Sequence, residues 1–362
     1  MKIFTNTFKE NQALINYCST NNSEISEGLY FDFQNKKVSL KNTYRSIFIQ
    51  FDLNYEEEEE KEYKNFLVNA DLFLSIISSN DFIYYDGKKF FYEKNEYNLR
   101  TNSSIVYPSD IDDEEYENSF EITPKVMALL NKSANIFFPE KAEHKFNTSY
   151  IDKGCIYSIN NYRGYLVKDD SLDENVKIDF HKDTIDILKC LSSKSIKFLY
   201  SEDEKSKKRK IVTDTGTSII FPCQRFPIPD FSSKIFDCAA RDEKVVLNKE
   251  DYVKTLNSLK SMYSSIDYDK NVAISINEDE MIFEVKDNIN PYIKLVIPII
   301  EKTNITSDVK TLNYENLIKV SKLIDGETIE LKIIDNLPIL ILKSTLENVF
   351  EISISNIPKI IK

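Results

Sequence analysis

Stretches in which apolar and polar residues alternate with period two are followed by stretches in which apolar residues recur every three or four positions. This order recurs six times along the chain. In each copy, a short alternating stretch typical of a strand leads into a polar residue. Apolar residues three and four apart then follow, as expected of an amphipathic helix. The predicted helices begin near Thr7, Asn69, Thr123, His181, Asn248 and Asn313. Most of these positions hold Asn or Thr, which favour helix N-caps.

Strand-like segments fill the intervals between the predicted helices. They alternate with period two or form short apolar runs, at 36–42, 45–53, 81–93, 194–202, 272–285 and 328–343. One helix for several antiparallel strands predicts an α+β fold with the helices on one face of the sheets. Two such units per domain predict three similar domains, at 1–116, 117–240 and 241–362.

The composition is that of a globular protein. The chain has 362 residues, 41% of them hydrophobic and 29% charged, which suits two or three domains rather than one. No apolar run is long enough to span a membrane, and the start "MKIFTNTFKE" lacks the pattern of a signal peptide. We therefore expect a cytoplasmic protein.

The net charge of −12 argues against a nucleic-acid partner until its distribution is considered. The six helical segments sum to +4, which leaves −16 for the rest of the chain. Solvation alone explains any single surface lysine. Helices that share one surface would nevertheless make it basic and suited to phosphate backbones. The candidate DNA-contacting residues are Lys125, Lys132, Lys182, Lys189, Lys254, Lys319 and Lys322.

The common signatures of catalysis and cofactor binding are missing from the sequence. There are two histidines, five cysteines without a CxxC pair, and six glycines that form no phosphate-binding loop. The acidic runs at 56–60 and 110–115 are typical of solvated loops. The basic run at 205–210 follows "SEDE", so a charged hairpin tip is its first interpretation and DNA contact the alternative. The sequence predicts no catalytic residue, metal site or cofactor.

A stiff apolar stretch, "QRFPIPDFSSKIF" at 224–236, stands out in a chain poor in proline. Pro227 and Pro229 fix φ and favour an extended backbone. Its part "RFPIPDFSSKIF" resembles the Phe-Pro-Asp-Tyr segment of the bacterial DNA polymerase III sliding clamp, the beta subunit. The segments "FEITPKVMALLNKSANIFF" and "TLNYENLIKVSKLI" are similar to stretches in the second and third domains of that family.

This resemblance covers the whole chain and implies a function without chemistry. Clamps of this family are head-to-tail homodimers that close a ring around duplex DNA, with their helices on the inner face and their sheets outside. They tether the replicative DNA polymerase, and they also bind the clamp loader and repair proteins. The alternatives are a clamp-fold structural or decoy protein without ring closure and a carboxylate-dependent hydrolase.

The resemblance also implies two sets of binding residues. An apolar cleft between the second and third domains, which takes short hydrophobic peptides of the partners, would use Phe146, Tyr162, Arg163, Pro229, Lys234, Asn313, Asn316, Leu337, Ile339, Ile352 and Ile354. The dimer interface would use Tyr97, Leu99, Met262 and Tyr263. Ordinary core packing is the alternative for each apolar cleft residue. The chain departs from the family at 159–162 and keeps only the arginine, Arg163.

Overall fold

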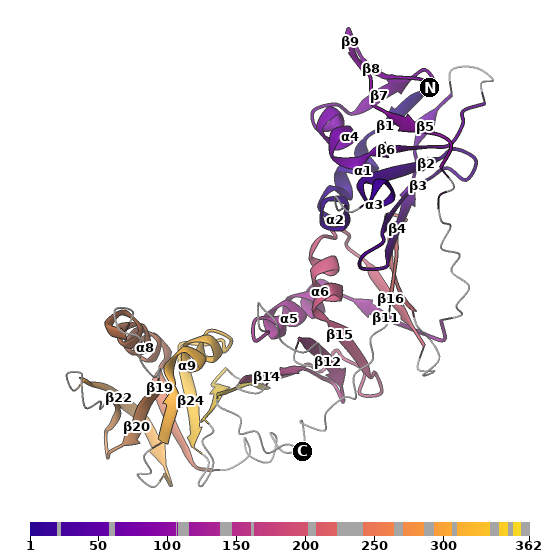
Figure 1. The fold of residues 1–362 in the computed structure, drawn as a ribbon. Coiled ribbons are helices and arrows are strands. Elements are labelled where there is room, and N and C mark those ends of the chain that lie inside the picture. Colours follow the sequence, from indigo (N-terminus) through magenta and orange to yellow (C-terminus); the bar gives the residue numbers. More distant parts are fainter. Residues whose placement is uncertain are drawn as a thin grey trace. The chain divides into compact units, whose positions relative to one another are not determined.

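Figure 1 shows the computed structural model of the protein. It describes residues 1–19, 23–57, 62–105, 107, 116–137, 147–160, 163–201, 208–222, 242–263, 271–285, 293–305, 310–333, 340–346 and 350–355. Within these residues the fold is α+β with antiparallel sheets, which confirms the predicted class. The stiff stretch at 224–236 lies outside the described residues. None of the described helices is long and apolar enough to cross a membrane.

The chain divides into two compact units, of which unit 1 comprises Met1–Met127 and Asp186–Gln224. Its five-stranded sheet has the order β5 (Tyr55–Glu56), β1 (Lys2–Phe4), β7 (Phe82–Tyr85), β8 (Phe90–Tyr92), β9 (Asn95–Tyr97). Its nine-stranded sheet has the order β10 (Thr101–Asn102), β6 (Phe66–Asn69), β2 (Gly28–Asp32), β3 (Lys37–Asn42), β4 (Ile47–Asp52), β18 (Ser218–Pro222), β17 (Lys208–Thr213), β16 (Ile196–Tyr200), β11 (Asn118–Ile122). Its helices are α1 (Asn6–Glu10), α2 (Gln12–Cys18), α3 (Glu24–Glu27) and α4 (Ala70–Ile77).

Unit 2 comprises Ala128–Ile185 and Arg225–Lys362 and is built on one sheet. The strand order is β15 (Ile178–His181), β12 (Thr148–Asp152), β13 (Cys155–Ile159), β14 (Arg163–Lys168), β26 (Phe350–Ser355), β25 (Leu340–Ser344), β24 (Thr328–Ile333), β19 (Lys244–Asn248), β22 (Ile293–Thr303), β21 (Glu280–Val285), β20 (Asn271–Ile276), β23 (Lys310–Asn313). The helices α8 (Lys249–Tyr263) and α9 (Tyr314–Ser321) belong to this unit. Two further helices, α5 (Pro124–Ala134) and α6 (Lys182–Lys189), run across the division between the units.

Side-chain caps explain why four of the predicted helices begin where the sequence predicts. The side chain of Asn69 accepts a hydrogen bond from the backbone N–H of Leu72 at 3.0 Å, at the start of α4. Thr123 caps α5 in the same way, with Pro124 as its first residue, where the missing N–H costs nothing. Asn248 and Asn313 do the same for α8 and α9. Helix α3 had no counterpart among the predicted helices.

The two units bury cores of different character. In unit 1 the core is aromatic: the Phe8 ring lies 5.0 to 5.6 Å from the rings of Phe31, Phe51 and Phe73. In unit 2 the apolar faces of α8 and α9 pack on aliphatic strand residues such as Leu247 and Ile329. Each helix thus buries one stripe and leaves a polar stripe exposed, as its periodicity predicted.

Twice, a strand of one predicted domain pairs antiparallel with a strand of the next predicted domain, and we call each of these pairings a seam. In unit 1, β4 pairs antiparallel with β18, with Ile49 opposite Ile219. In unit 2, β14 pairs antiparallel with β26, with Leu166 opposite Ile352. Both seams cross the predicted domain boundaries, and residues 108–115 and 223–241, next to those boundaries, lie outside the described residues. The division into three domains at 1–116, 117–240 and 241–362 stays a prediction.

Candidate nucleic-acid and peptide interfaces

The helices α8 and α9 of unit 2 lie side by side and contact each other (Figure 1). Tyr252 and Leu256 of α8, and Leu317 of α9, are fully buried on the side of the sheet. On the polar side, Lys254, Lys319 and Lys322 are exposed. The periodicity that buries one stripe therefore presents three of the predicted DNA-contacting lysines to solvent.

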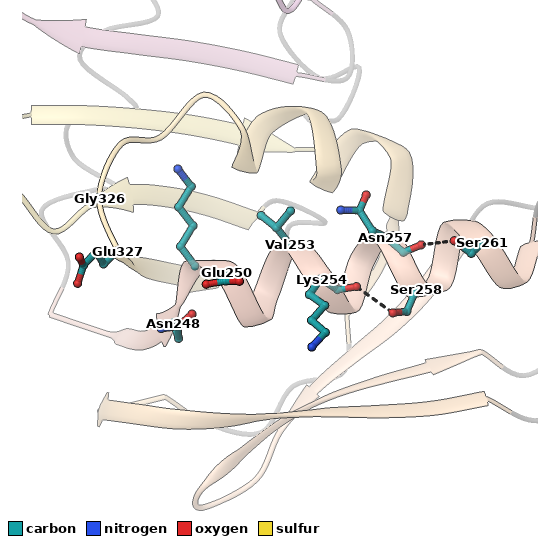
Figure 2. Close-up of a pocket in the computed structure, with 10 residues that line it drawn as sticks. Asn248, Glu250, Val253, Lys254, Asn257, Ser258, Ser261, Gly326 and Glu327 are labelled. Atoms are coloured by element: carbon teal, nitrogen blue, oxygen red, sulfur yellow. Dashed lines mark hydrogen bonds between the residues drawn. The ribbon is translucent and has the colours of Figure 1, made fainter.

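A hollow of about 810 Å³ lies along the polar stripe of α8 (Figure 2). Its lining consists of Asn248, Lys249, Glu250, Val253, Lys254, Asn257, Ser258, Ser261, Gly326 and Glu327. The hydroxyls of Ser258 and Ser261 donate to the carbonyls of Lys254 and Asn257, at 3.0 and 3.1 Å. The lining holds two lysines and two glutamates, so its charge is balanced. Its lining carries hydroxyl, amide, carboxylate and ammonium groups.

The other predicted lysine pairs lie on α5 and α6. Lys125 and Lys189 are exposed, whereas Lys182 is half-buried at the start of α6. The ammonium of Lys189 pairs with Asp186, one turn earlier, at 3.2 Å. A pair of this kind in solvent contributes little to stability and can exchange for a phosphate contact.

The structure places Lys132 differently from the other lysines. Its side chain is only 19% exposed, and its ammonium pairs with the carboxylates of Glu351 and Asp325, the latter at 2.8 Å. It also lies 5.7 Å from the ring centroid of Tyr165. Lys132 is thus held against the sheet of unit 2, although the sequence placed it on the same stripe as Lys125.

The seam of β14 and β26 brings together part of the predicted cleft. Arg163, at 1% exposure, lies opposite Ser355, and burial lowers the pKa of its guanidinium. Ile352 is fully buried opposite Leu166. Because side chains alternate along a strand, Arg163 and Ile352 project from opposite faces of the seam. Ile354 lies opposite Gly164 in the same pairing.

Two predicted cleft residues lie at the start of α9. The side chain of Asn313 accepts hydrogen bonds from the backbone N–H groups of Glu315 and Asn316, at 3.0 and 3.2 Å. Both asparagines are half-buried. The other predicted cleft residues lie outside the part of the chain that the structure describes: Phe146, Tyr162, Pro229, Lys234, Leu337 and Ile339. Their role, like that of the whole cleft, stays a prediction.

The predicted dimer residues lie on an edge strand and at the end of a helix. Tyr97 ends β9, the last strand of the five-stranded sheet, and both it and Leu99 are half-buried. In unit 2, Met262 is 45% exposed near the end of α8, and Tyr263 is the last residue of that helix. Sequence reasoning missed two exposed apolar residues on β22, Val296 at 41% and Ile300 at 60%. Their signal was the unusually long apolar run of that strand.

No group of three or more His, Cys, Asp or Glu side chains could hold a metal ion among the residues that the structure describes. The buried thiols are protonated, since burial raises the pKa of Cys18 to about 12 and that of Cys155 to about 11.

Solved structures resemble the chain over nearly its whole length. The DNA polymerase III beta subunit from Thermotoga maritima is 14% identical, with 98% of this chain and 97% of that chain covered and a TM-score of 0.73. The DNA polymerase sliding clamp from Pseudomonas aeruginosa is 12% identical, and the sliding clamp from Bartonella birtlesii, bound to griselimycin, is 15% identical. Both matches cover 98% of each chain with a TM-score of 0.77. No protein-family model and no curated protein matches the sequence.

The chain has the sliding-clamp fold. This confirms the resemblance that three short segments had indicated, and it does so over 98% of the chain. At identities of 12 to 15% the likeness concerns the fold, which hosts its function through particular surfaces. In the clamp fold of this chain, the polar helix stripes and the seams are the surfaces that carry candidate residues.

One prediction concerns Asn313, where a cap and a predicted cleft residue coincide. Replacing Asn313 with alanine removes the acceptor for two N–H groups of α9, so unit 2 should lose about 1 kcal/mol of unfolding free energy. Chemical denaturation followed by circular dichroism measures this loss. Asn313→Asp keeps the acceptor beside the helix N-terminus and should leave the stability within about 0.5 kcal/mol of the wild type. An equal loss in both variants would contradict the cap.

Proposed function

We propose that the protein is a DNA polymerase processivity factor, a sliding clamp that closes a ring around duplex DNA as a homodimer. The observation that carries this proposal is the clamp fold over 98% of the chain. The role requires no reaction, so we propose that the protein is not an enzyme. The ring would tether the replicative polymerase, and the clamp loader and repair proteins would bind the same surface.

Ring closure is supported by the order of strands around each helix. β4, β14 and β22 are each the third strand after the first helix of a predicted domain, and β9, β18 and β26 are each the third strand after the second helix. β4 pairs with β18 and β14 pairs with β26. By the same rule, β22 of one copy would pair with β9 of another, which is a head-to-tail contact that closes with two copies.

The two strands left over have the features of such a contact. Among the described residues, β9 pairs only with β8, so one of its edges is open. The first half of β22 pairs with β21, and β19 joins only from Ile299 onward. Pro298 falls in the first half, as expected for an edge, where a missing N–H is tolerated. An edge paired with a second copy would no longer invite aggregation.

DNA contact is supported by the exposed lysines of α8 and α9. Lys254, Lys319 and Lys322 would meet phosphates with partly solvated ammonium groups. Each such contact contributes about −0.9 to the slope of log affinity against log salt, without reading sequence. Weak and non-specific contacts let a ring slide, whereas the topology of the ring keeps it on the DNA.

The test is a polymerase processivity assay on circular primed DNA, with and without the protein and a clamp loader. We expect longer products with the protein, and retention on nicked circles but loss from linear DNA with free ends. Equal loss from circles and linear DNA would contradict encirclement. A stable monomer at all concentrations, with no gain in product length, would favour the clamp-fold decoy instead.

A further inference from the structure

One acidic side chain in the seam of unit 2 is almost completely buried. Glu351 of β26 is 2% exposed. Its carboxylate accepts hydrogen bonds from the Tyr165 hydroxyl at 2.5 Å and from the Asp325 backbone N–H at 2.8 Å, and it pairs with the ammonium of Lys132. The four groups come from β14, β26, α5 and the loop that follows α9. Distant parts of unit 2 therefore meet on one carboxylate.

A buried charge of this kind is tolerated only with its partners in place. Three donors satisfy Glu351, and the exposed carboxylate of Asp325 also binds Lys132. Buried ion pairs are often no better for stability than apolar side chains of the same volume, and their best-attested role is to specify one arrangement. The question is which arrangement Glu351 specifies.

The strand register gives the answer. Glu351 lies opposite Val167 and diagonal to Tyr165, on the same face of the seam. A slip of one residue between β26 and β14 would move Glu351 to the other face, away from Lys132 and Tyr165, and would leave its charge without donors. The apolar residues of β26, Phe350, Ile352 and Ile354, alternate with Glu351, Ser353 and Ser355, so this pattern also opposes a slip of one residue. A slip of two residues keeps the pattern, and only the contacts of Glu351 with Tyr165 and Lys132 distinguish it from the observed register.

We infer that Glu351 is a positioning residue, whose carboxylate fixes the register of β26 against β14 through Tyr165 and Lys132. The same contact holds the strand that carries Ile352 and Ile354, and its consequence for partner peptides rests on the proposed function. It also takes Lys132 out of the polar stripe of α5. The DNA-contacting role predicted for Lys132 is therefore replaced here by a role within the seam.

Hydrogen–deuterium exchange of the full-length protein tests this, without DNA or partner, so that a failure of the proposed function leaves the result readable. In Glu351→Leu, the amides of β26 and β14 should exchange at least about tenfold faster, while those of β19 keep their wild-type rates. In Glu351→Gln, which still accepts hydrogen bonds, the exchange of β26 should return to within about threefold of the wild type.

Two more variants make the test decisive. Lys132→Met removes one partner and leaves the Tyr165 and Asp325 donors in place, so it gives the same local effect if Glu351→Leu fails to fold. Lys244→Met removes the ammonium that pairs with Glu301 at 2.9 Å in the same sheet, between β19 and β22, and should leave β26 unchanged. Acceleration spread evenly over β19, β24 and β26, or wild-type exchange in both seam variants, would overturn the inference.

Discussion

Replacing Val296 and Ile300 with aspartate is expected to weaken self-association by at least about a hundredfold. Both residues are exposed on β22, the strand that would pair with β9 of a second copy in the proposed ring. An interface that closes over two unpaired carboxylates pays at least about 3 kcal/mol of desolvation, and every 1.4 kcal/mol corresponds to a factor of ten in affinity. Sedimentation velocity over a concentration series measures the change.

The matched control is Leu346→Asp. Leu346 is also an exposed apolar residue of unit 2, at 45%, but it follows β25 rather than lying on β22. Its replacement should leave the dimer intact, and the thermal midpoint of each variant should stay near that of the wild type because none of the three side chains is buried. A double variant that dimerises as tightly as the wild type would show that β22 is not the joint.

The fold could be predicted from the sequence because each local signal agrees with its neighbours. Asn69, Thr123, Asn248 and Asn313 lie where caps belong, and apolar residues three and four apart follow each of them. The strands at 272–285 and 328–343 alternate around turns, and both form hairpins. Local propensity and pattern pointed to the same elements, which is what makes a fold readable.

The contacts of the candidate site residues could not be predicted from the sequence, because the partners of these side chains lie on strands that are distant in the sequence. Lys132 and Lys125 share a stripe by their spacing of seven residues, yet Lys132 meets Glu351, which is 219 residues away. The spacing of residues on a helix predicts which face a side chain lies on, but it does not predict which residue that side chain contacts. Arg163 and Ile352 likewise came from one resemblance, but strand alternation puts them on opposite faces of the seam.

The seams themselves needed the pairing of strands that are far apart in the sequence. The apolar runs of β4 and β14 are typical of buried strands, but they do not predict that β18 and β26 are the strands with which they pair. Only β22 carried a local hint, since it is longer than its counterparts and contains Pro298. A proline inside an apolar run indicates an edge, and the proposed dimer would pair this edge with a second copy.

Replacing Lys254, Lys319 and Lys322 with glutamate is expected to weaken binding to nicked circular DNA at least about tenfold at 100 mM salt. Lys254 and Lys319 lie on the exposed stripes of α8 and α9, and Lys322 is the exposed residue that follows α9. Each lost phosphate contact should also reduce the salt slope by about 0.9. Fluorescence anisotropy of labelled circles at several salt concentrations measures both quantities, and sedimentation checks that the dimer persists.

Lys88, Lys168 and Lys197, changed to glutamate together, form the matched control. They are exposed, but they lie on a turn and on strands rather than on helices, and their replacement alters the net charge by the same amount. Long-range electrostatic repulsion of DNA would affect both triple variants alike. Salt screens this repulsion, with a Debye length of about 10 Å at 0.1 M. Direct phosphate contact affects only the helix variant and changes its salt slope. Equal losses in the two variants, with equal slopes, would therefore remove α8 and α9 from the DNA-contacting surface.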